Sequence, residues 1–368
     1  MIRVGSGTFD LGSTNFNLNL VGTEQEPIWI VAQEGATPIL ERNTTSKNIV
    51  DMGNGSPTRY LVVRGFEMRG GSAGVRMHNV QNVWFDQNEI HSTGDAALTT
   101  NTFDTANLYI TRNHIHHTSG TGEGMYLGAN NGVYKMRDSI IALNHVHDTL
   151  NAEQGDGIEL KQGSFNNWIA RNFVHDTKYP CILVYGTDGA ARNVIEGNIA
   201  YNSQDNVMQV QGEALVINNF AMNGGNAFYS NDHQGTSRDL HVIHNTFVNT
   251  GTAARLNNWT DRPNMIFANN AAYSQNGYAI QIGGGSSGVA LAGNVTMGLI
   301  SGTNSGFVSG NGLTDFVNLS FGSVPQNAFP APGSALIGAG NSTYSLQLDL
   351  TFNLRATALD AGALDYAN

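Results

Sequence analysis

The fold of this chain is decided by four stretches that repeat one pattern: NVWFDQNEIHSTG (residues 82–94), NLYITRNHIHHTSG (107–120), SIIALNHVHDTL (139–150) and NWIARNFVHDTK (167–178). Each stretch holds a short alternating strand, an Asn, a second short strand and a polar turn. Further copies follow, so that an Asn recurs every 21 to 31 residues. The recurrent residues are Asn88, Asn113, Asn144, Asn172, Asn198, Asn219, Asn245, Asn270 and Asn294.

This repeat predicts an all-β fold, a right-handed parallel β-helix. A period of about 25 residues is too short for repeats of paired helices, and the apolar residues alternate singly, as strands require. We therefore expect a solenoid of about twelve coils, each with three short strands. The recurrent Asn would occupy a bend, because Asn tolerates the left-handed conformation, and its amide would bond to the Asn of the next coil.

The ends of the chain are less regular than its middle. We expect one β-helix domain over residues 1–368, in which 1–60 form an N-terminal cap and the first coils. Residues 61–300 would form the regular coils, and 301–368 the last coils and a C-terminal cap. Such caps hide the open strand edges at the two ends of a solenoid.

Composition excludes several classes of protein. The 368 residues include 18 basic and 29 acidic ones, for a net charge of −11, which argues against nucleic acid as a partner. No apolar run is long enough to span a bilayer, so we expect no membrane partner. Cys181 is the only cysteine, which excludes a disulfide within the chain and a structural zinc site built on cysteines.

One outward sheet face carries candidate binding residues. It is formed by the strands that follow each Gly-rich turn, such as GVRMHN (74–79), GMYLGA (124–129) and GIELKQ (157–162). By the period of two, its first outward column is Arg76, Leu98, Tyr126, Glu159, Leu183, Met208, Phe228 and Arg255. The second is His78, Thr100, Gly128, Lys161, Tyr185, Val210, Ser230 and Asn257.

Cations and aromatic rings on one face suit a linear acidic glycan, and the alternative is an ordinary solvated face. We expect an acidic polysaccharide to be bound by the following substrate-binding residues: Arg76, His78, Tyr126, Arg255 and Asn257.

An acidic column lies just before these strands: Asp95, Glu123, Asp156, then Pro180 and Asp205. Carboxylates on neighbouring coils would lie only about 5 Å apart and need neutralisation. A Ca²⁺ ion bound by Glu123 and Asp156, with Glu159 beside it, would provide this through oxygen ligands. In the alternative, each carboxylate accepts hydrogen bonds from the backbone of its own turn.

A histidine column follows the recurrent Asn by three residues: His91, His116, His147 and His175, continued by Tyr201. Repetition in register favours a stacking ladder. The alternatives are a catalytic base and a transition-metal site.

Three segments carry a family resemblance: YLVVRGFEMRGG (60–71), GDGIELKQGSFNNWIARNFVHDT (155–177) and DLTFNLRATALDAGALDY (349–366). They resemble secreted bacterial pectate-lyase-like β-helix proteins, and most nearly the polysaccharide lyase family that includes alginate lyases and chondroitinase B. The resemblance implies a catalytic lysine at Lys161, followed by Ser164, and calcium-binding acids at Asp156 or Glu159 with Glu123. The family's arginine one coil later is missing here, where Val184 or Tyr185 stands.

We therefore expect a polysaccharide lyase that cleaves uronide linkages by β-elimination, with catalytic residues Lys161, Glu159 and Tyr185. Lys161 would remove the C5 proton and Tyr185 would protonate the leaving oxygen. One alternative is a glycoside hydrolase that uses two carboxylates from Asp156, Glu159 and Asp205. Another is a non-catalytic glycan-binding β-helix, such as an adhesin or a tailspike module.

The opening MIRVGSGTFDLG lacks the apolar segment of a signal peptide and resembles the start of a strand. Because the outward face suits an extracellular glycan, we expect a secreted or periplasmic protein from which a leader has been removed. We also expect a monomer, whereas a tailspike module would form a trimer.

Overall fold

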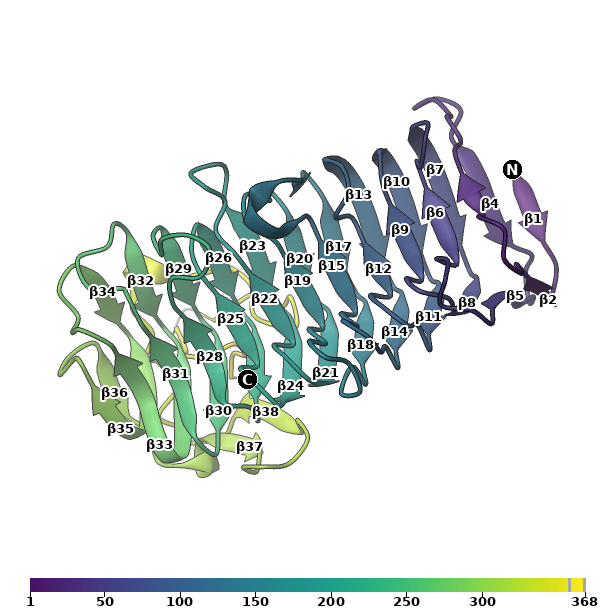
Figure 1. Ribbon diagram of the computed structural model, residues 1–368. Helices are drawn as coiled ribbons and strands as arrows, with labels where there is room; N and C mark the ends of the chain where they lie inside the picture. The colour runs from purple at the N-terminus through teal and green to yellow at the C-terminus, as the bar shows by residue number, and fades with distance from the viewer. Residues whose placement is uncertain (357–358, 367–368) are drawn as a thin grey trace. The chain divides into compact units, whose positions relative to one another are not determined.

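The computed structural model describes residues 1–356 and 359–366. It divides into two compact units, Met1–Tyr179 and Pro180–Asn368, each of which is a stack of coils built from parallel strands (Figure 1). The predicted parallel β-helix is confirmed in each unit. The expectation of a single domain stays a prediction.

Three rows of strands form the first unit, and each coil contributes one strand to each row. The first row contains β1 (Ile2–Val4), β4 (Ile28–Ala32), β7 (Thr58–Arg64), β10 (Val80–Asp86), β13 (Thr105–Thr111), β17 (Ile140–Ala142) and β20 (Trp168–Ala170), with β16 (Met136–Arg137) beside β13. The second contains β2 (Gly7–Asp10), β5 (Pro38–Arg42), β8 (Glu67–Gly70), β11 (Glu89–His91), β14 (His114–His116), β18 (His145–His147) and β21 (Phe173–Thr177). The third contains β3 (Asn17–Leu18), β6 (Val50–Met52), β9 (Val75–Met77), β12 (Leu98–Thr99), β15 (Met125–Leu127) and β19 (Ile158–Leu160).

The second unit repeats this arrangement. Its first row contains β23 (Asn193–Glu196), β26 (Ala214–Ile217), β29 (Leu240–Ile243), β32 (Met265–Ala268) and β34 (Val289–Ala292). Its second contains β24 (Ile199–Ser203), β27 (Phe220–Met222), β30 (Thr246–Asn249), β33 (Ala271–Ile282), β35 (Asn294–Ser301) and β36 (Phe307–Ser309). Its third contains β22 (Ile182–Val184), β25 (Met208–Val210), β28 (Asn226–Ser230) and β31 (Thr252–Leu256), after which β33 and β35 bend to continue the row.

Helical structure is limited to three 3₁₀ turns in the described ranges: η1 (Asn130–Gly132), η2 (Leu313–Asp315) and η3 (Ser342–Tyr344). No helix among the described residues has the length and apolar character needed to cross a membrane.

The core forms because alternate side chains of all three rows point to the coil axis. In the first unit, Phe85 of the first row, Ile115 of the second and Met125 of the third are fully buried. Burying each of these side chains contributes roughly 1.5–3 kcal/mol. The intervening residues point outward, so each row presents columns of side chains to solvent.

The recurrent Asn residues form the predicted amide ladder inside each unit. In the first unit, the Nδ2 groups of Asn88, Asn113 and Asn144 donate to the next Asn Oδ1 at 3.3, 2.9 and 2.9 Å, ending at Asn172. The prediction that these Asn residues adopt the left-handed conformation is wrong. The residue before each of them adopts it instead. These residues include Gln87, Arg112, Leu143 and Arg171, with φ between 54° and 61°. The side chain of each ladder Asn is buried, where it forms hydrogen bonds with backbone N–H and carbonyl groups, as Asn144 does.

Asn144→Ala is expected to lower the free energy of unfolding by about 3–5 kcal/mol, because it leaves several buried polar groups without partners. Asn144 Nδ2 donates to Asn172 Oδ1 and to the Ile110 carbonyl, both at 2.9 Å, and its Oδ1 accepts the Asn113 backbone N–H at 3.0 Å. Urea unfolding would measure the loss against Asn43→Ala, an exposed position. A loss no larger than that of the control would refute a structural role for the ladder.

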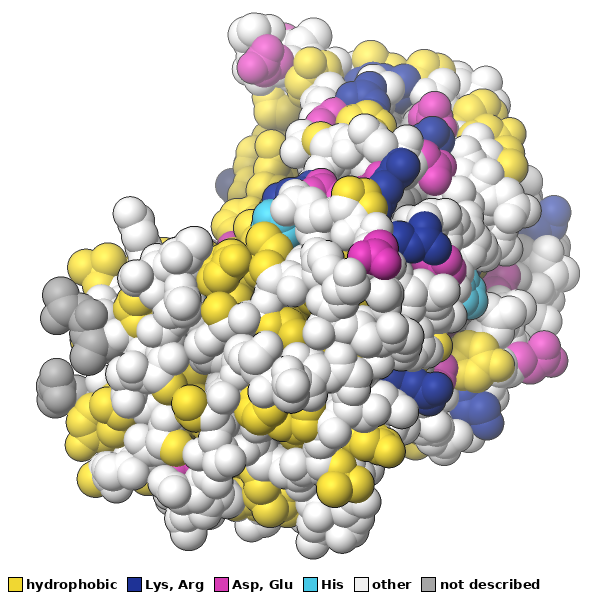
Figure 2. All heavy atoms as spheres, turned by 90° about the vertical axis from the view of Figure 1, so that its left-hand side faces the viewer, with side chains coloured by type: hydrophobic (Ala, Val, Ile, Leu, Met, Phe, Trp, Pro, Cys, Tyr) yellow, Lys and Arg dark blue, Asp and Glu magenta, His cyan; other side chains and the backbone are white. Residues whose placement is uncertain are grey.

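The C-terminal segment covers a lateral face of the second unit. Strands β37 (Phe316–Asn318) and β38 (Asn327–Pro330) pair antiparallel, and Figure 1 shows them beside β30. Phe316, Leu319 and Leu336 pack onto outward residues of the second row, including Val248 and Tyr273, in one buried cluster. In Figure 2, the end of this unit that holds β34 and β36 faces the viewer, and uncharged polar and hydrophobic groups dominate its surface.

Candidate active site

The candidate site lies on the outward face of β9, β12, β15 and β19 in the first unit. Arg76, Thr99, Tyr126 and Glu159 occupy matching positions on these strands. The predicted column is thus confirmed for Arg76, Tyr126 and Glu159. Leu98 was expected in this column but is fully buried, and Thr99 takes its place.

The same one-residue error occurs in the second unit. Met208 and Phe228 were expected to point outward, but they are fully buried, and Gln209 and Tyr229 occupy the outward positions beside Arg255. The expected outward positions Thr100, Val210 and Ser230 are likewise fully buried. The strands begin at different distances from their Gly-rich turns, and a shift of one residue moves every side chain to the other face.

Three buried carboxylates converge at the centre of the site. Glu123, Asp156 and Glu159 each place one oxygen so that all three lie within 4.8 Å of one another. Each residue is only 2% exposed. Burial, together with the negative charges of Glu159 and Asp95, raises the pKa of Glu123 to about 7, although Lys161 opposes the shift. The expected approach of Glu123, Asp156 and Glu159 is therefore confirmed.

Lys161 is held beside these carboxylates by two contacts. Its Nζ donates to Glu159 Oε1, and it lies 4.3 Å from the centroid of the Tyr126 ring, in a cation–π contact. Lys161 is 4% exposed, so both contacts are largely shielded from water. Burial raises the pKa of the Tyr126 phenol above its ordinary value, and Glu159 adds to this shift.

Gly128 leaves room next to Lys161. Its φ is +84°, and a Cβ there would lie 2.7 Å from Ser164 Oγ and 3.3 Å from Lys161 Cβ. Ser164 Oγ accepts the Met136 backbone N–H at 3.1 Å, so this hydroxyl helps to fix the turn that follows the lysine.

A polar cavity of about 230 Å³ opens between Arg76 and Glu123. Arg76 reaches Asn101 Oδ1 at 3.3 Å and Asp95 Oδ2 at 3.7 Å. The walls are completed by Thr99, Thr121, Glu123, Tyr126, Asn130 and Gln154. Sequence reasoning missed Asn101 because of the one-residue error at Leu98, since the register places Asn101 level with His78 and Gly128. Asn130 and Gln154 were missed because they belong to turns of unequal length.

Asp95 follows the alternative interpretation of the acidic column, in which a carboxylate accepts hydrogen bonds from the backbone of its own turn. Its Oδ1 accepts the backbone N–H of Ala96 at 2.9 Å and the hydroxyl of Thr121. Asp95 therefore stabilises its own turn, as short acidic side chains often do.

His78 faces the same side but is bonded on both ring nitrogens. Its Nε2 lies 2.9 Å from Asp51 Oδ1 and its Nδ1 lies 2.9 Å from Thr102 Oγ1. The ring is thus fixed in the protein.

The remaining predicted residues belong to the second unit. Tyr185 is buried, and its Oη lies 3.2 Å from His233 Nε2. The Arg255 guanidinium lies 5.9 Å from the Tyr229 ring centroid, and Asn257 Nδ2 donates to Tyr229 Oη at 3.4 Å. Tyr229 was missed because of the one-residue register error at Phe228.

The histidine column lies on the second row, away from the third-row face that carries Lys161. The rings of His91, His116, His147 and His175 stack with centroids 4.9, 5.1 and 5.0 Å apart and planes within 9° of parallel. The expected stacking ladder is confirmed for these four residues.

Without bound metal, the stability of the protein should fall as the pH rises from about 4.5 to about 7, because of Glu123. In this range the folded protein keeps the Glu123 proton, whereas the unfolded chain has released it, so deprotonation favours unfolding. The raised pKa of Glu123 corresponds to a loss of about 3 kcal/mol in the free energy of unfolding across this pH range. Urea unfolding with a chelator, at about pH 5 and about pH 8, would measure it as the difference between wild type and Glu123→Gln. Parallel pH profiles for the two proteins would contradict the assignment.

Comparison with known proteins shows the family to which this chain belongs. A family model described as a right handed beta helix region matches residues 25–219. Pectate lyase Pel9A has a similar structure, with a TM-score of 0.53 and 13% sequence identity, covering 100% of this chain and 88% of that chain. The alginate lyase AlyGC of family PL6 has a TM-score of 0.40 and 13% identity, covering 84% of this chain and 50% of its own. The mannuronan C-5 epimerase AlgE4 A-module of Azotobacter vinelandii has a TM-score of 0.38 and 13% identity, covering 82% and 91%. No curated protein sequence matches.

Proposed function

Because this chain belongs to the family of proteins with a right-handed β-helix region, we propose that it is a polysaccharide lyase that cleaves uronic-acid polymers by β-elimination. One observation carries the proposal: the amine of Lys161 is buried between Glu159 and the Tyr126 ring, beside Glu123 and Asp156. A buried lysine among carboxylates is a typical arrangement for proton transfer in a shielded site.

The proposed substrate is an acidic polysaccharide. Arg76 lines the cavity next to Tyr126, so it is placed to bind a sugar carboxylate while the aromatic ring contacts a sugar. Pel9A, the protein of similar fold, is a pectate lyase, and we extend that substrate class to this chain. Arg255 and Asn257 are proposed as glycan-binding residues of the second unit.

In the proposed reaction, the Lys161 ammonium first passes a proton to Glu159, to which it is hydrogen-bonded. The neutral Lys161 amine then takes the proton from C5 of the uronide. The C5–H electron pair forms the C4–C5 double bond, the C4–O4 bond breaks, and O4 takes a proton from a tyrosine. We propose Tyr126 as the proton donor, because Tyr126 contacts Lys161 and its raised pKa keeps the phenol protonated. Tyr185, the donor expected from the sequence, belongs to the second unit. Comparing Tyr126→Phe with Tyr185→Phe identifies the donor. Removing the donor should slow product formation, and the effect should be largest on substrates with poor leaving groups.

The residues fit a calcium ion, which we propose as the cofactor. Glu123, Asp156 and Glu159 provide the oxygen ligands that Ca²⁺ prefers, and Lys161 offsets only one of the three carboxylates. Bound there, the ion would supply neutralisation of the substrate carboxylate. Glu123 would bind the ion only after its carboxyl group has lost its proton, and burial raises the pKa of that group.

A screen of polymannuronate, polyguluronate, polygalacturonate, dermatan and glucuronan, with and without Ca²⁺, tests the proposal. The expected result is ultraviolet absorbance from the new double bond on at least one polymer. Reducing ends without that absorbance would indicate the hydrolase alternative. The carboxylate oxygens of this cluster lie within 4.8 Å of one another, which is closer than the about 6.5–9.5 Å of inverting hydrolases and near the about 5–5.5 Å of retaining ones. Binding without any product would indicate a non-catalytic glycan-binding protein.

We further propose that the protein acts outside the cytoplasm, in the periplasm or after secretion, because polyuronates are extracellular polymers. We propose that it acts as a monomer, whereas a tailspike module would form a trimer. Light scattering would measure the oligomeric state.

A further inference from the structure

A second group of ligands lies on the second row, formed by histidines of β14 and β18. Two outward columns run side by side there: Glu89, His114, His145 and Phe173 form one, and His91, His116, His147 and His175 form the other. The residues between the two columns, such as Ile115 and Val146, are fully buried. The histidines therefore project together from the solvent side of the sheet, where stacking alone requires only one column.

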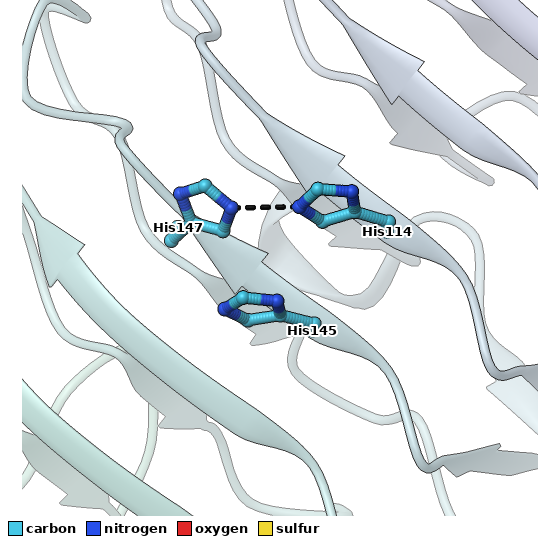
Figure 3. Close-up of side chains that lie close together, drawn as sticks. All are labelled: His114, His145 and His147. Atoms are coloured by element: carbon cyan, nitrogen blue, oxygen red, sulfur yellow. Dashed lines mark hydrogen bonds between the residues drawn. The ribbon is translucent and has the colours of Figure 1, made fainter.

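The two columns meet through their ring nitrogens. His114 Nε2 lies 2.8 Å from His147 Nε2, across two neighbouring strands (Figure 3). In Figure 3 the His145 ring lies directly beside this pair. One ring nitrogen from each of His114, His145 and His147 lies within 4.8 Å of the other two.

Each histidine of the pair His114 and His147 also has a carboxylate near its Nδ1 atom. His147 Nδ1 lies 2.8 Å from Asp148 Oδ2, and His114 Nδ1 lies 3.5 Å from Glu89 Oε1. A carboxylate that accepts the Nδ1–H proton leaves the Nε2 lone pair available, and this is the usual surrounding of a metal-bound histidine. Here two such nitrogens face each other, which a bound cation would stabilise better than a single shared proton.

We propose that His114, His145 and His147 bind a divalent transition-metal ion, such as Zn²⁺. Imidazole ligands favour zinc, copper and nickel over calcium. Zinc–nitrogen bonds of about 2.0–2.1 Å place two ligands of a tetrahedral site roughly 3.3 Å apart. The His114 and His147 nitrogens lie 2.8 Å apart, so the two rings would move apart by about 0.5 Å to bind the ion.

The proposed site has a structural role. His114 belongs to β14, whereas His145 and His147 belong to β18, so the ion would link two successive coils of the first unit. It lies on a different row from Lys161 and the carboxylates, and it does not depend on the lyase proposal.

Zinc titration of the metal-stripped full-length protein tests the site, with excess Ca²⁺ present to occupy the carboxylates. We expect one equivalent of Zn²⁺ to bind and to raise the melting temperature. His145→Phe should weaken this binding by at least about 100-fold, while its ring continues to stack, because Phe173 already occupies the next position of that column. His91→Phe is the matched control, since it changes a stacked ring outside the ligand set and should leave zinc affinity unchanged.

His114→Gln provides a second ligand variant in case His145→Phe is poorly folded, which circular dichroism would reveal. Absence of zinc binding in the wild type would overturn the proposal. Zinc binding that survives in a folded ligand variant would overturn it as well and leave the histidines as a stacking ladder.

Discussion

Lys161→Ala is expected to lower the initial rate of double-bond formation by about 10²–10⁴-fold, the usual contribution of a general base. Lys161 is the buried amine that contacts both Glu159 and Tyr126, so its removal takes the proposed base from the site. Lys161→Arg should be nearly as inactive, because a guanidinium can keep the ion pair with Glu159 but does not release its proton. Ultraviolet absorbance on the most active polyuronate would measure the rates.

Lys47→Ala is the matched control, because Lys47 is exposed on a turn. It should keep the wild-type rate. Changing Lys161 disturbs the cation that offsets buried carboxylates, which can destabilise the protein. Circular dichroism and urea unfolding would therefore check that Lys161→Arg is folded. A folded Lys161→Arg protein with wild-type activity would exclude Lys161 as the base and direct attention to Tyr126.

Removal of divalent metal by a chelator is expected to reduce the same rate by at least about 100-fold, and Ca²⁺ should restore it. The expected size reflects the several kcal/mol by which a cation stabilises charge on a carboxylate substrate. Glu123→Gln and Asp156→Asn should each raise the calcium concentration needed for half-maximal activity by about 10-fold or more, since each removes a charged ligand. Calorimetric titration would measure calcium binding directly.

Glu153→Gln is the control for these two variants, because Glu153 is exposed and outside the carboxylate cluster. Its calcium affinity should equal that of the wild type. Full activity of the wild type in chelator would contradict the calcium proposal and leave Arg76 as the group that neutralises the substrate carboxylate.

Features that repeat in every coil could be predicted from the sequence. The Asn ladder and the His stack follow from spacing alone, because residues at equal positions of successive coils must meet. Glu159 and Lys161 share a face because they are two positions apart on one strand, and their ion pair is observed.

Features that depend on turn geometry could not be predicted. Leu98 and Phe228 were assigned to the wrong face, because the number of residues between turn and strand varies by one. Gln154 enters the cavity from a turn whose length the strand pattern does not set. The diagonal contact between His114 and His147 requires the relative position of two columns, which periodicity within one column does not supply.

The central claim is that the site with Lys161 breaks a uronide linkage without water. Digesting the most active polyuronate in heavy-oxygen water and measuring product masses tests this most directly. The account predicts unlabelled products whose non-reducing end is lighter than a hydrolysis product by one water. Products that incorporate the heavy oxygen at the cleaved linkage would show hydrolysis and contradict the account.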